Sequence, residues 1–363
     1  MTIHTLPTPA LLLELSVFQS NREAMSALLK DSSLSLRPHY KSHKCAAIAH
    51  MQIADGAVGM TCAKLDEALD LADSGIEDIL IANQIADPAK IRRGASLAGD
   101  CRLTVCIDCA ENADAWEKAA AEAGTTVHCL VEYEIGMQRC GVTDPAEAVA
   151  LAERIAGHAH LRFDGIQAYA GHVSHMESEE DRLRYTRENG AKVRALLTML
   201  EKAGVPAKTV SGGSTGTAQI KAMEGLYTEL QAGSYLFMDA TYRNLGLPFG
   251  NALTVLSTVV STRPGLIVAD AGVKSCGVDQ GMPVPVGMDV DHIVASEEHF
   301  QLHGAVLHGA VPHDPTRMLT VGDRLRLVPG HCCSTVNLYD RIYVVDGDKV
   351  VDRLQITARG GCR

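Results

Sequence analysis

A lysine with basic neighbours follows one of the strand-like segments of the chain. Lys41 comes just after residues 34–39, and His39, His43 and Lys44 surround it in the sequence. An amine crowded by other cations has a lowered pKa, and a neutral amine at a strand end can attack an aldehyde. A basic surface loop would look the same. The other chemistry-bearing residues must decide between the two interpretations.

A second candidate site is a run of glycines and hydroxyl side chains after the strand-like segment 208–211. It consists of Ser211, Gly212, Gly213, Ser214, Thr215, Gly216 and Thr217. Backbone N–H groups at a helix start bind phosphate, although the run does not match a Walker A motif. Alone it could equally be a flexible turn. Its place after the seventh predicted strand, where barrel enzymes often hold phosphate, favours a phosphate cradle.

The elements that must position these groups alternate between strands and helices. Strand-like segments occur at residues 34–39, 57–62, 79–83, 103–108, 127–132, 163–169, 208–211 and 229–235. Stretches with helical periodicity lie between most of them, including 64–74, 112–123, 145–157 and 181–203. This alternation is typical of a parallel sheet closed into a (β/α)8 TIM-like barrel, with an open doubly wound sheet as the alternative.

After Pro248 the pattern changes to short β-branched runs separated by Gly, Pro, Asp and Asn. These runs are at 254–262, 266–269, 324–328, 342–345 and 350–356. They predict a second, mainly antiparallel β-domain. An early strand at residues 8–15 precedes the first helix and is expected to join it. We therefore predict a barrel domain over 17–248 and a β-domain formed by 1–16 and 249–363.

Composition limits the class of partner. The chain has 363 residues, 46% of them hydrophobic, and a formal net charge of -11. Because no long Lys/Arg cluster occurs, nucleic acid and anionic membranes are not expected as partners, and small-molecule chemistry is favoured. The first ten residues lack the layout of a signal peptide and no apolar run reaches spanning length, which predicts a cytoplasmic protein with reduced cysteines.

A lysine after the first barrel strand and a phosphate cradle after the seventh together suggest pyridoxal 5′-phosphate. Its aldehyde needs a lysine, and its phosphate needs hydrogen-bond donors. The sequence resembles the fold-type III pyridoxal-phosphate enzymes, and within them the D-threonine aldolase and D-serine dehydratase family. The matching stretches are residues 37–44, 134–141, 167–175, 211–217, 231–235 and 329–339.

This resemblance implies roles for several residues. Lys41 corresponds to the Schiff-base lysine, Arg139 to the arginine that contacts the phenolate oxygen of the cofactor, and Tyr169 to a residue lining its ring. Gln231 lies where alanine racemases of this fold place an arginine beside the pyridine nitrogen, while a strand-end cap is an equal alternative. The resemblance also assigns three further residues to the cofactor: Gly233, Ser234 and Tyr235.

His331 and Cys333 form a candidate metal-ligand pair. Residues two apart on an extended strand point the same way, and two protein ligands leave positions for water and substrate. A buried thiol beside a loop histidine is the alternative. The resemblance implies a divalent metal here: manganese or zinc, with magnesium as a further option. Aldolases of the family often have aspartate at the position of Cys333 and D-serine dehydratases have cysteine, whose thiolate favours zinc.

The family implies a lyase that acts on a small D-amino acid, in a homodimer. We predict a metal-dependent aldolase that cleaves D-threonine and related D-β-hydroxy-α-amino acids to glycine and an aldehyde, with His175 as the base for the substrate hydroxyl and His172 as its rival. The nearest alternative is a dehydratase of D-serine or D-threo-3-hydroxyaspartate that forms a 2-oxo acid and ammonia. An amino-acid racemase and a non-catalytic pyridoxal-phosphate carrier are the others.

Overall fold

The computed structural model describes residues 1–307 and 319–363, and the chain divides into two compact units. Unit 1 comprises Met1–Ala24, Ser42–Cys45 and Ser234–Arg359. Unit 2 comprises Met25–Lys41, Ala46–Gly233 and Gly360–Arg363. The long segments of the two units meet at 24/25 and 233/234. The predicted domain boundaries at 17 and 248 stay a prediction.

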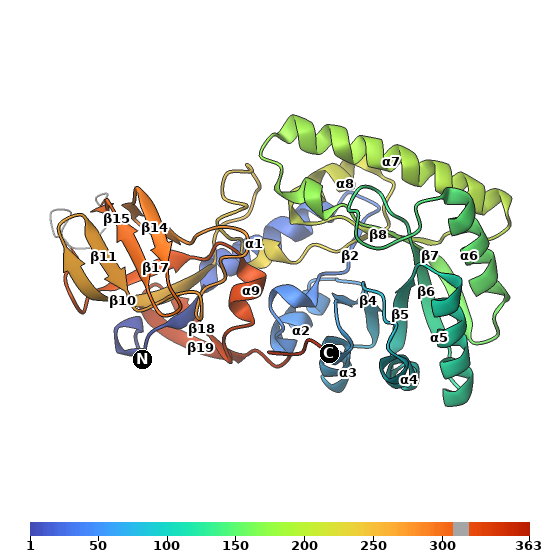
Figure 1. The fold of residues 1–363 in the computed structure, drawn as a ribbon, viewed down its shortest axis with the longest axis horizontal. Helices are drawn as coiled ribbons and strands as arrows, with labels where there is room; N and C mark the ends of the chain where they lie inside the picture. Colours follow the sequence, from blue (N-terminus) through green and yellow to red (C-terminus); the bar gives the residue numbers. More distant parts are fainter. Residues whose placement is uncertain (308–318) are drawn as a thin grey trace. The chain divides into compact units, whose positions relative to one another are not determined.

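Unit 2 contains eight parallel strands in one sheet (Figure 1). They are β2 (Ser35–Leu36), β3 (Met60–Cys62), β4 (Asp78–Ile81), β5 (Arg102–Ile107), β6 (Val127–Glu132), β7 (Leu161–Ala168), β8 (Thr209–Gly212) and β9 (Glu229–Leu230). The sheet order is β2-β9-β8-β7-β6-β5-β4-β3. A bridge between His39 and Thr61 joins its two ends, and the Thr61 N–H donates to the Pro38 carbonyl at 2.9 Å. The predicted TIM-like barrel is confirmed.

Helices connect these strands and cover the outside of the barrel (Figure 1). They are α2 (Ala46–Ala54), α3 (Leu65–Asp73), α4 (Pro88–Leu97), α5 (Ala110–Ala123), α6 (Pro145–Gly157), α7 (Glu179–Lys202) and α8 (Ala218–Glu224). Local sequence sets their starts: Asp87 and Asp144 each accept two backbone N–H bonds as N-caps, followed by proline at the first helical position. The helix α1 (Leu15–Leu29) precedes them and runs from unit 1 into unit 2.

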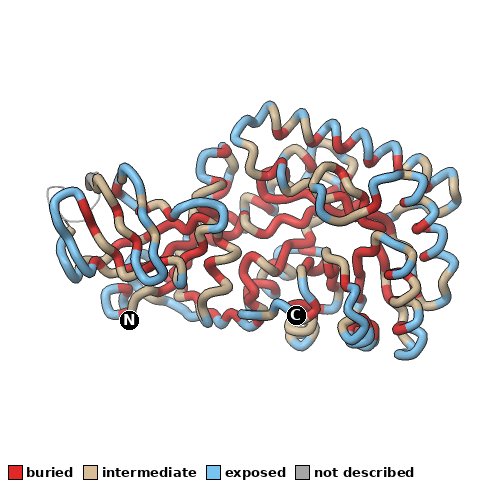
Figure 2. The backbone as a smooth tube through the Cα atoms, in the orientation of Figure 1, coloured by how far each residue is buried: buried red, intermediate tan, exposed pale blue. Residues whose placement is uncertain are grey.

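The barrel interior is a packed core rather than a channel. Leu80, Cys106 and Leu130, from three neighbouring strands, form one buried cluster. The strands are buried along most of their length, whereas the outer faces of the helices are exposed (Figure 2). Side chains that carry chemistry can therefore only project from the ends of the strands, where the connecting segments begin.

Among the described residues, unit 1 contains one large, mainly antiparallel sheet built from both ends of the chain and a separate two-stranded sheet. Its strands are β1 (Ala10–Glu14), β10 (Leu253–Arg263), β11 (Leu266–Ala269), β12 (Val284–Pro285), β13 (Met288–Asp289), β14 (His292–Ala295), β15 (Phe300–His303), β16 (Val306–Leu307), β17 (Arg324–Val328), β18 (Arg341–Asp346) and β19 (Lys349–Gln355). The main order is β14-β15-β11-β10-β1-β18-β19. Because β1 pairs antiparallel to β10 and parallel to β18, the expected second β-domain with an early strand is confirmed.

The core of unit 1 forms where β1 meets the later strands. Ala10 and Leu12 pack with Leu256 and Val345 in one buried cluster.

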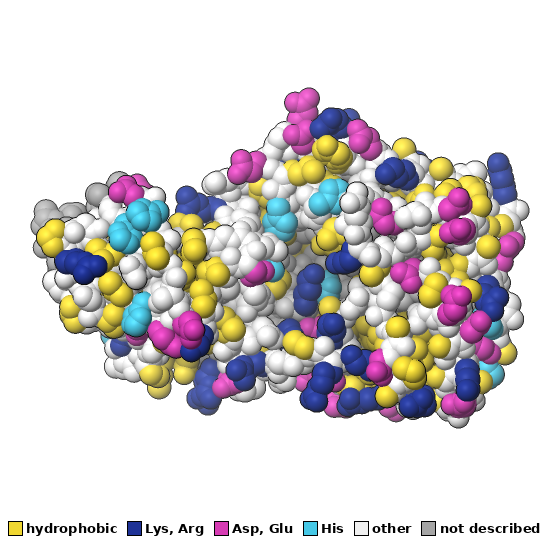
Figure 3. Space-filling view, viewed as in Figure 1, with side chains coloured by type: hydrophobic (Ala, Val, Ile, Leu, Met, Phe, Trp, Pro, Cys, Tyr) yellow, Lys and Arg dark blue, Asp and Glu magenta, His cyan; other side chains and the backbone are white. Residues whose placement is uncertain are grey.

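On the face seen in Figure 3, acidic and basic side chains are interspersed over the barrel helices. Among the described residues, no helix is both long enough and apolar enough to span a bilayer.

Candidate active site

Lys41 lies beyond the carboxyl end of β2, in the short 3-10 helix η2 (Tyr40–Ser42). The backbone on its N-terminal side is fixed twice: the buried Tyr40 hydroxyl donates to Asp70, and the N–H of Lys41 donates to Nδ1 of His39 at 3.4 Å. Lys41 itself is half-buried. Its main chain is therefore held in place while its amine projects from the strand end, as a nucleophile requires.

The predicted phosphate cradle follows β8 and enters the short helix η4 (Thr215–Thr217), which continues into α8. Gly213 has φ +73°, a left-handed conformation that glycine adopts without strain. The turn is closed by reciprocal bonds, because the Ser214 N–H donates to Thr217 Oγ1 at 3.1 Å and the Thr217 N–H donates to the Ser214 carbonyl at 3.2 Å. Local hydrogen bonds thus preform the loop.

The cradle has hydrogen-bonding capacity that the protein does not use. Thr215 Oγ1 is buried and has no hydrogen-bond partner in the part of the chain that the structure describes. The N–H groups of Thr215 and Gly216 lie at the helix start, where no preceding turn supplies an acceptor. A buried polar atom without a partner is costly unless a ligand supplies one. These groups fit a phosphate.

Arg139 and Tyr169 come together at the carboxyl ends of β6 and β7. The guanidinium carbon of Arg139 lies 5.8 Å from the centre of the Tyr169 ring. The loop before Arg139 is shaped by Glu134, whose carboxylate accepts the N–H bonds of Gly136 at 2.6 Å and Gln138 at 3.0 Å. An arginine over an aromatic ring is a cation–π pair with donors left for an anionic oxygen.

Both candidate bases lie in one short helix, η3 (Gly171–His175), after β7. His172 is exposed and packs against Gly136, where an added Cβ would lie 3.0 Å from the imidazole. His175 is half-buried, with its Nδ1 inside the protein. The hydroxyl of Ser174, between them in the sequence, accepts a hydrogen bond from Ser214 Oγ of the cradle at 2.9 Å. The helix therefore sits directly against the phosphate cradle.

Gln231 follows β9 and is buried beside the cradle. Its N–H donates to the Gly212 carbonyl at 3.0 Å. Its side-chain Nε2 donates to Gln167 Oε1 at 2.8 Å and to Ser211 Oγ at 2.9 Å. The barrel thus brings together Lys41, Arg139, Tyr169, the cradle and Gln231 at the carboxyl ends of its strands. Gly233 ends unit 2, and Ser234 and Tyr235 belong to unit 1, so their assignment to a cofactor remains a prediction.

In unit 1 the pair His331 and Cys333 does not lie on an extended strand, so that prediction is wrong. His331 is the extended N-cap residue of a short helix, α9 (Cys332–Val336), and Cys333 is in its first turn. The turn nevertheless brings the two side chains within hydrogen-bonding reach of each other, and leaves Cys332 buried. The helix begins here because the buried Asp239 carboxylate accepts the Cys332 N–H at 3.0 Å.

A second carboxylate orients His331. Asp279 Oδ2 lies 2.7 Å from His331 Nδ1, which leaves Nε2 as the ring nitrogen available to a metal. Burial disfavours the imidazolium, but the hydrogen bonds and negative charges of Cys333 and Asp279 outweigh it and raise the pKa of His331 to about 9. A metal ion would compete with that proton. The imidazole and thiolate together form a soft donor set.

The surroundings of Cys333 connect it to two chain segments named above. Its Sγ lies 3.5 Å from Ser42 Oγ and 3.9 Å from Ser234 Oγ, all within unit 1. Ser42 is the residue after Lys41, and Ser234 follows Gly233. No group of three or more His, Cys, Asp or Glu side chains arranged for a metal occurs among the described residues. A metal at the pair would keep positions for water or substrate.

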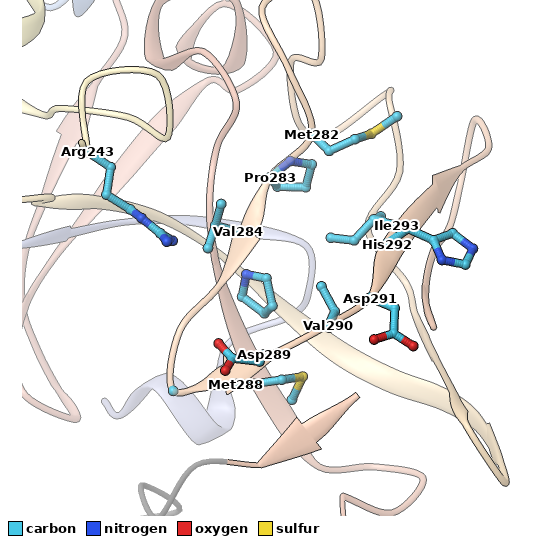
Figure 4. A pocket seen from close by; sticks show the side chains of 12 residues that line it. Arg243, Met282, Pro283, Val284, Met288, Asp289, Val290, Asp291, His292 and Ile293 are labelled. Atoms are coloured by element: carbon cyan, nitrogen blue, oxygen red, sulfur yellow. The ribbon is translucent and has the colours of Figure 1, made fainter. Parts of the chain in front are cut away.

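An open groove of about 550 Å³ in unit 1 is lined by Arg243 and by residues of the segment 282–293 (Figure 4). Arg243 comes from a loop opposite that segment, which also supplies Asp289 and Asp291. None of the residues predicted to do chemistry lines this groove. Its size alone therefore gives it no role in the reaction.

Sequence reasoning missed several groups that support the predicted residues. Asp279 and Asp239 hold the His331–Cys333 turn, and Gln84 and Gln167 surround a buried carboxylate, Glu132, in the barrel. The one available signal was a carboxylate at the end of a mostly apolar strand, as with Glu132 in Val127–Glu132. Asp239 and Asp279 lie in irregular segments and had no such signal.

Two family models match this chain. The model described as alanine racemase, N-terminal domain, matches residues 13–241, and the model described as putative serine dehydratase domain matches residues 252–345.

Individual relatives match over nearly the whole length. The chain is 38% identical to a D-threonine aldolase of Arthrobacter sp, covering 98% of this chain and 93% of the relative. It is 29% identical to a D-threo-3-hydroxyaspartate dehydratase of Delftia sp. (strain HT23), covering 92% and 93%. The solved structure of D-threonine aldolase from Filomicrobium marinum superposes with a TM-score of 0.93 at 36% identity, covering 100% of this chain and 98% of that one.

Proposed function

From the premise that this chain belongs to the D-threonine aldolase and D-serine dehydratase family, with its alanine racemase-like N-terminal domain, we propose that it is an aldolase. Its substrates would be D-threonine and related D-β-hydroxy-α-amino acids, and its products glycine and an aldehyde. One observation carries the choice: identity to the aldolase is 38%, against 29% to the dehydratase, at similar coverage.

The family and the fold imply pyridoxal 5′-phosphate as the cofactor. Lys41 would bind its aldehyde and Arg139 its phenolate oxygen, with Tyr169 and Gln231 along the ring. Its phosphate would be held by the cradle: Ser211, Gly212, Gly213, Ser214, Thr215, Gly216 and Thr217. The unused hydroxyl of Thr215 supports this assignment. When bound, the cofactor supplies a ring that accepts the electron pair left on the substrate α-carbon.

His331 Nε2 and Cys333 Sγ are proposed as the two protein ligands of a divalent metal. The bond of His331 Nδ1 to Asp279 supports this, because it fixes the tautomer that presents Nε2. When bound, a metal lowers the pKa of a coordinated hydroxyl group. The nitrogen and sulfur donors favour zinc over manganese or magnesium.

His175 is proposed to take the proton of the substrate β-hydroxyl as the Cα–Cβ bond breaks. Its Nδ1 is buried, so Nε2 is the ring nitrogen left for that proton. His172 is the rival base and is the more exposed of the two. Exchange of each histidine for glutamine separates them, because the true base should lose turnover while cofactor binding stays normal.

A dehydratase is the second candidate, and one observation favours it. Cys333, the proposed sulfur ligand, is the residue type that D-serine dehydratases of the family have at this position. In that reaction the Lys41 amine would remove the α-proton, and the β-hydroxyl would leave. The metal pair and the cofactor site would be unchanged, so only the products distinguish the two.

Product analysis tests the proposal. The purified protein is incubated with D-threonine, pyridoxal phosphate and either manganese or zinc, with L-threonine as the matched control. Glycine and acetaldehyde from the D-isomer alone are expected. 2-Oxobutanoate and ammonia would instead make it a dehydratase. Epimerised threonine, or cofactor binding without turnover on D-threonine or D-3-hydroxyaspartate, would replace the aldolase by the racemase or the carrier. Light scattering tests the proposed homodimer.

A further inference from the structure

A chain of polar side chains crosses the carboxyl ends of four neighbouring barrel strands. Glu132 ends β6, Gln167 is near the end of β7, Ser211 is near the end of β8 and Gln231 directly follows β9. The sheet register places Glu132 opposite Gln167 and Gln167 opposite Ser211. All four are at least 95% buried. In this region each donor and acceptor must therefore be matched within the protein or by a ligand.

We call these four hydrogen-bonded side chains the relay. The hydrogen bond at Glu132 fixes the direction of the other hydrogen bonds in it. Glu132 receives hydrogen bonds from Gln84 Nε2 and from the Gln167 side chain. A carboxylate can only accept, so Gln167 must present its Nε2 to Glu132. Burial raises the pKa of Glu132, and the bond from Gln84, the charge of Arg139 and the bond from Gln167 act against that rise.

The next links follow from the first. With its Nε2 turned to Glu132, Gln167 presents Oε1 to Gln231, and this atom accepts from Gln231 Nε2 at 2.8 Å. The second hydrogen on Gln231 Nε2 goes to Ser211 Oγ at 2.9 Å. Both N–H groups of the Gln231 amide are therefore used within the described residues. The polar atom that Gln231 can offer to a ligand is Oε1, an acceptor.

The strand order places this acceptor between the two groups proposed to hold the cofactor. In the sheet, β9 lies between β2, which leads to Lys41, and β8, which leads to the cradle. A cofactor held by its aldehyde at Lys41 and its phosphate at the cradle would pass over the end of β9, which Gln231 follows. Arg139 would supply the cation for its phenolate oxygen. The ring nitrogen would be the remaining polar atom, and Gln231 would be its partner.

We propose that the relay from Glu132 through Gln167 makes Gln231 an obligate hydrogen-bond acceptor, and that it thereby holds the ring nitrogen of the cofactor in its protonated, pyridinium form. This rests on the cofactor site of the proposed function and deepens it. An unprotonated nitrogen would bring two lone pairs together in a buried site. A proton on the nitrogen, taken from solvent, turns that repulsion into a charge-assisted hydrogen bond.

The protonation state matters for the reaction. A positively charged ring withdraws the electron pair of the breaking Cα–Cβ bond more strongly than a neutral ring does. Glu132, Gln167 and Ser211 would then be positioning residues, since they act on the ring only through the orientation of Gln231. A neutral amide in this position thus still affects the electronic state of the ring, because the orientation of the amide decides which protonation state of the ring nitrogen is stable.

Nitrogen NMR tests the inference without measuring turnover. The protein is loaded with pyridoxal phosphate carrying ¹⁵N in the ring, and its resonance is followed from pH 6 upward until the ring loses its proton. We expect the shielded position of a pyridinium from pH 6 to at least pH 9. A resonance at the position of a neutral pyridine at pH 7 would overturn the inference.

Variants of Gln231 test whether a hydrogen-bond acceptor, rather than an amide group as such, keeps the ring nitrogen protonated. Gln231→Glu keeps an acceptor and should retain the pyridinium resonance, whereas Gln231→Arg offers only donors and should move it to the neutral position. Glu132→Gln releases the direction of the relay and should lower the pH at which the ring loses its proton by about one unit, the equivalent of one hydrogen bond. An unchanged titration in Glu132→Gln would contradict the relay.

Glu67→Gln is the matched control. Glu67 is also a buried barrel glutamate, but its carboxylate accepts from the backbone N–H groups of Ala63 and Lys64. This variant should keep the wild-type resonance. The two levels of failure are distinguishable: if the labelled cofactor does not attach to Lys41, the proposed function fails, and if it attaches with a neutral ring, only the present inference fails.

Discussion

The two ends of the barrel differ in whether their polar side chains pair with one another or are left for a ligand. At the amino ends of the strands, charges pair with one another. Arg37 donates to Glu229 through Nε at 2.9 Å and Nη2 at 2.8 Å, and to Asp78 through Nη1 at 2.7 Å. Arg102 donates to Asp78 at 3.0 Å and to Asp164 at 2.5 Å. The charges at this end satisfy one another.

At the carboxyl ends of the same strands, some of the described hydrogen-bonding atoms are left for a ligand. Thr215 Oγ1 is buried without a partner in the described structure, and the hydrogen bonds of Gln231 leave its Oε1 for a ligand. Lys41 and Arg139 also lie at this end, and neither forms an ion pair with another residue that the structure describes. One end therefore contributes to stability by itself, whereas the other is completed only by what it binds.

The largest expected effect is on the ligand-binding end. Lys41→Ala should lower kcat for D-threonine cleavage on the order of 10³-fold or more, because the covalent anchor of the cofactor is removed. Borohydride reduction followed by mass spectrometry should then find no cofactor on the chain. The free energy of unfolding should change little. Lys30→Ala, at an exposed lysine, is the control and should keep both activity and the covalent adduct.

The opposite end should show the reverse pattern. Arg37→Met leaves the carboxylates of Glu229 and Asp78 without their guanidinium, and should lower the free energy of unfolding by about 3–5 kcal/mol in urea denaturation. Turnover per folded molecule should stay within a few-fold of wild type. Arg93→Met removes an exposed arginine that lies 3.6 Å from Asp66 and should cost about 1 kcal/mol or less.

Normal stability with lost turnover in Arg37→Met would contradict the assignment of stability to the amino ends of the strands and of ligand binding to their carboxyl ends.

Lys221 is an exception that sharpens the comparison, since it is a buried charge beside the cradle. Its Nζ lies 3.1 Å from Glu224 Oε2, and an added Cβ on Gly213 would lie 3.4 Å from its stem. Burial lowers the pKa of Lys221 from 10.5 to about 8, although Glu224 opposes this. Between these pH values the unfolded chain binds more protons than the folded one, so stability should rise with pH, on the order of 3 kcal/mol.

Urea denaturation at several pH values from 7 to 10.5 measures this rise. Lys221→Met should lack that part of the pH dependence, because the buried titrating group is gone. Lys118→Met, at a lysine whose side chain is 80% exposed, should keep the wild-type slope. Identical slopes in all three proteins would mean that Lys221 is not a buried titrating charge.

The smallest expected effect is at the unused hydroxyl of the cradle. Thr215→Val should weaken pyridoxal phosphate binding about tenfold, the value of one hydrogen bond, and leave binding of pyridoxal, which has no phosphate, nearly unchanged. The melting temperature of the cofactor-free protein should not fall, because the substitution removes a buried polar atom that lacks a partner. Equal weakening of both ligands would argue against a phosphate contact.

Local patterns predicted the ligand-binding end better than the opposite end. Lys41, the cradle and Gln231 all follow recognisable strands, and parallel strands bring such residues to the same edge. The pairing of Arg37, which follows β2, with Asp78 and Glu229, which begin β4 and β9, joins residues far apart in the chain. No periodicity encodes such contacts, because they depend on how the sheet closes.

The metal-ligand pair shows a right choice of residues with wrong local geometry. His331 and Cys333 were placed on a strand by their spacing, but a helix begins between them. The reason is a long-range contact: the Asp239 carboxylate caps the Cys332 N–H. A sequence window around Cys332 does not contain the residue that decides its conformation.

The position of β1 in the sheet has a consequence for synthesis on the ribosome. Leu12 pairs with Thr254 on one side and Tyr343 on the other, and both partners are added long after it. At about 5–20 residues per second, this strand waits for tens of seconds. During that time a leucine-rich segment with both edges unpaired is exposed to chaperones and to other nascent chains, while the barrel sequence behind it is already complete. Yield in the cell should therefore depend on protection of β1 until its partner strands are made.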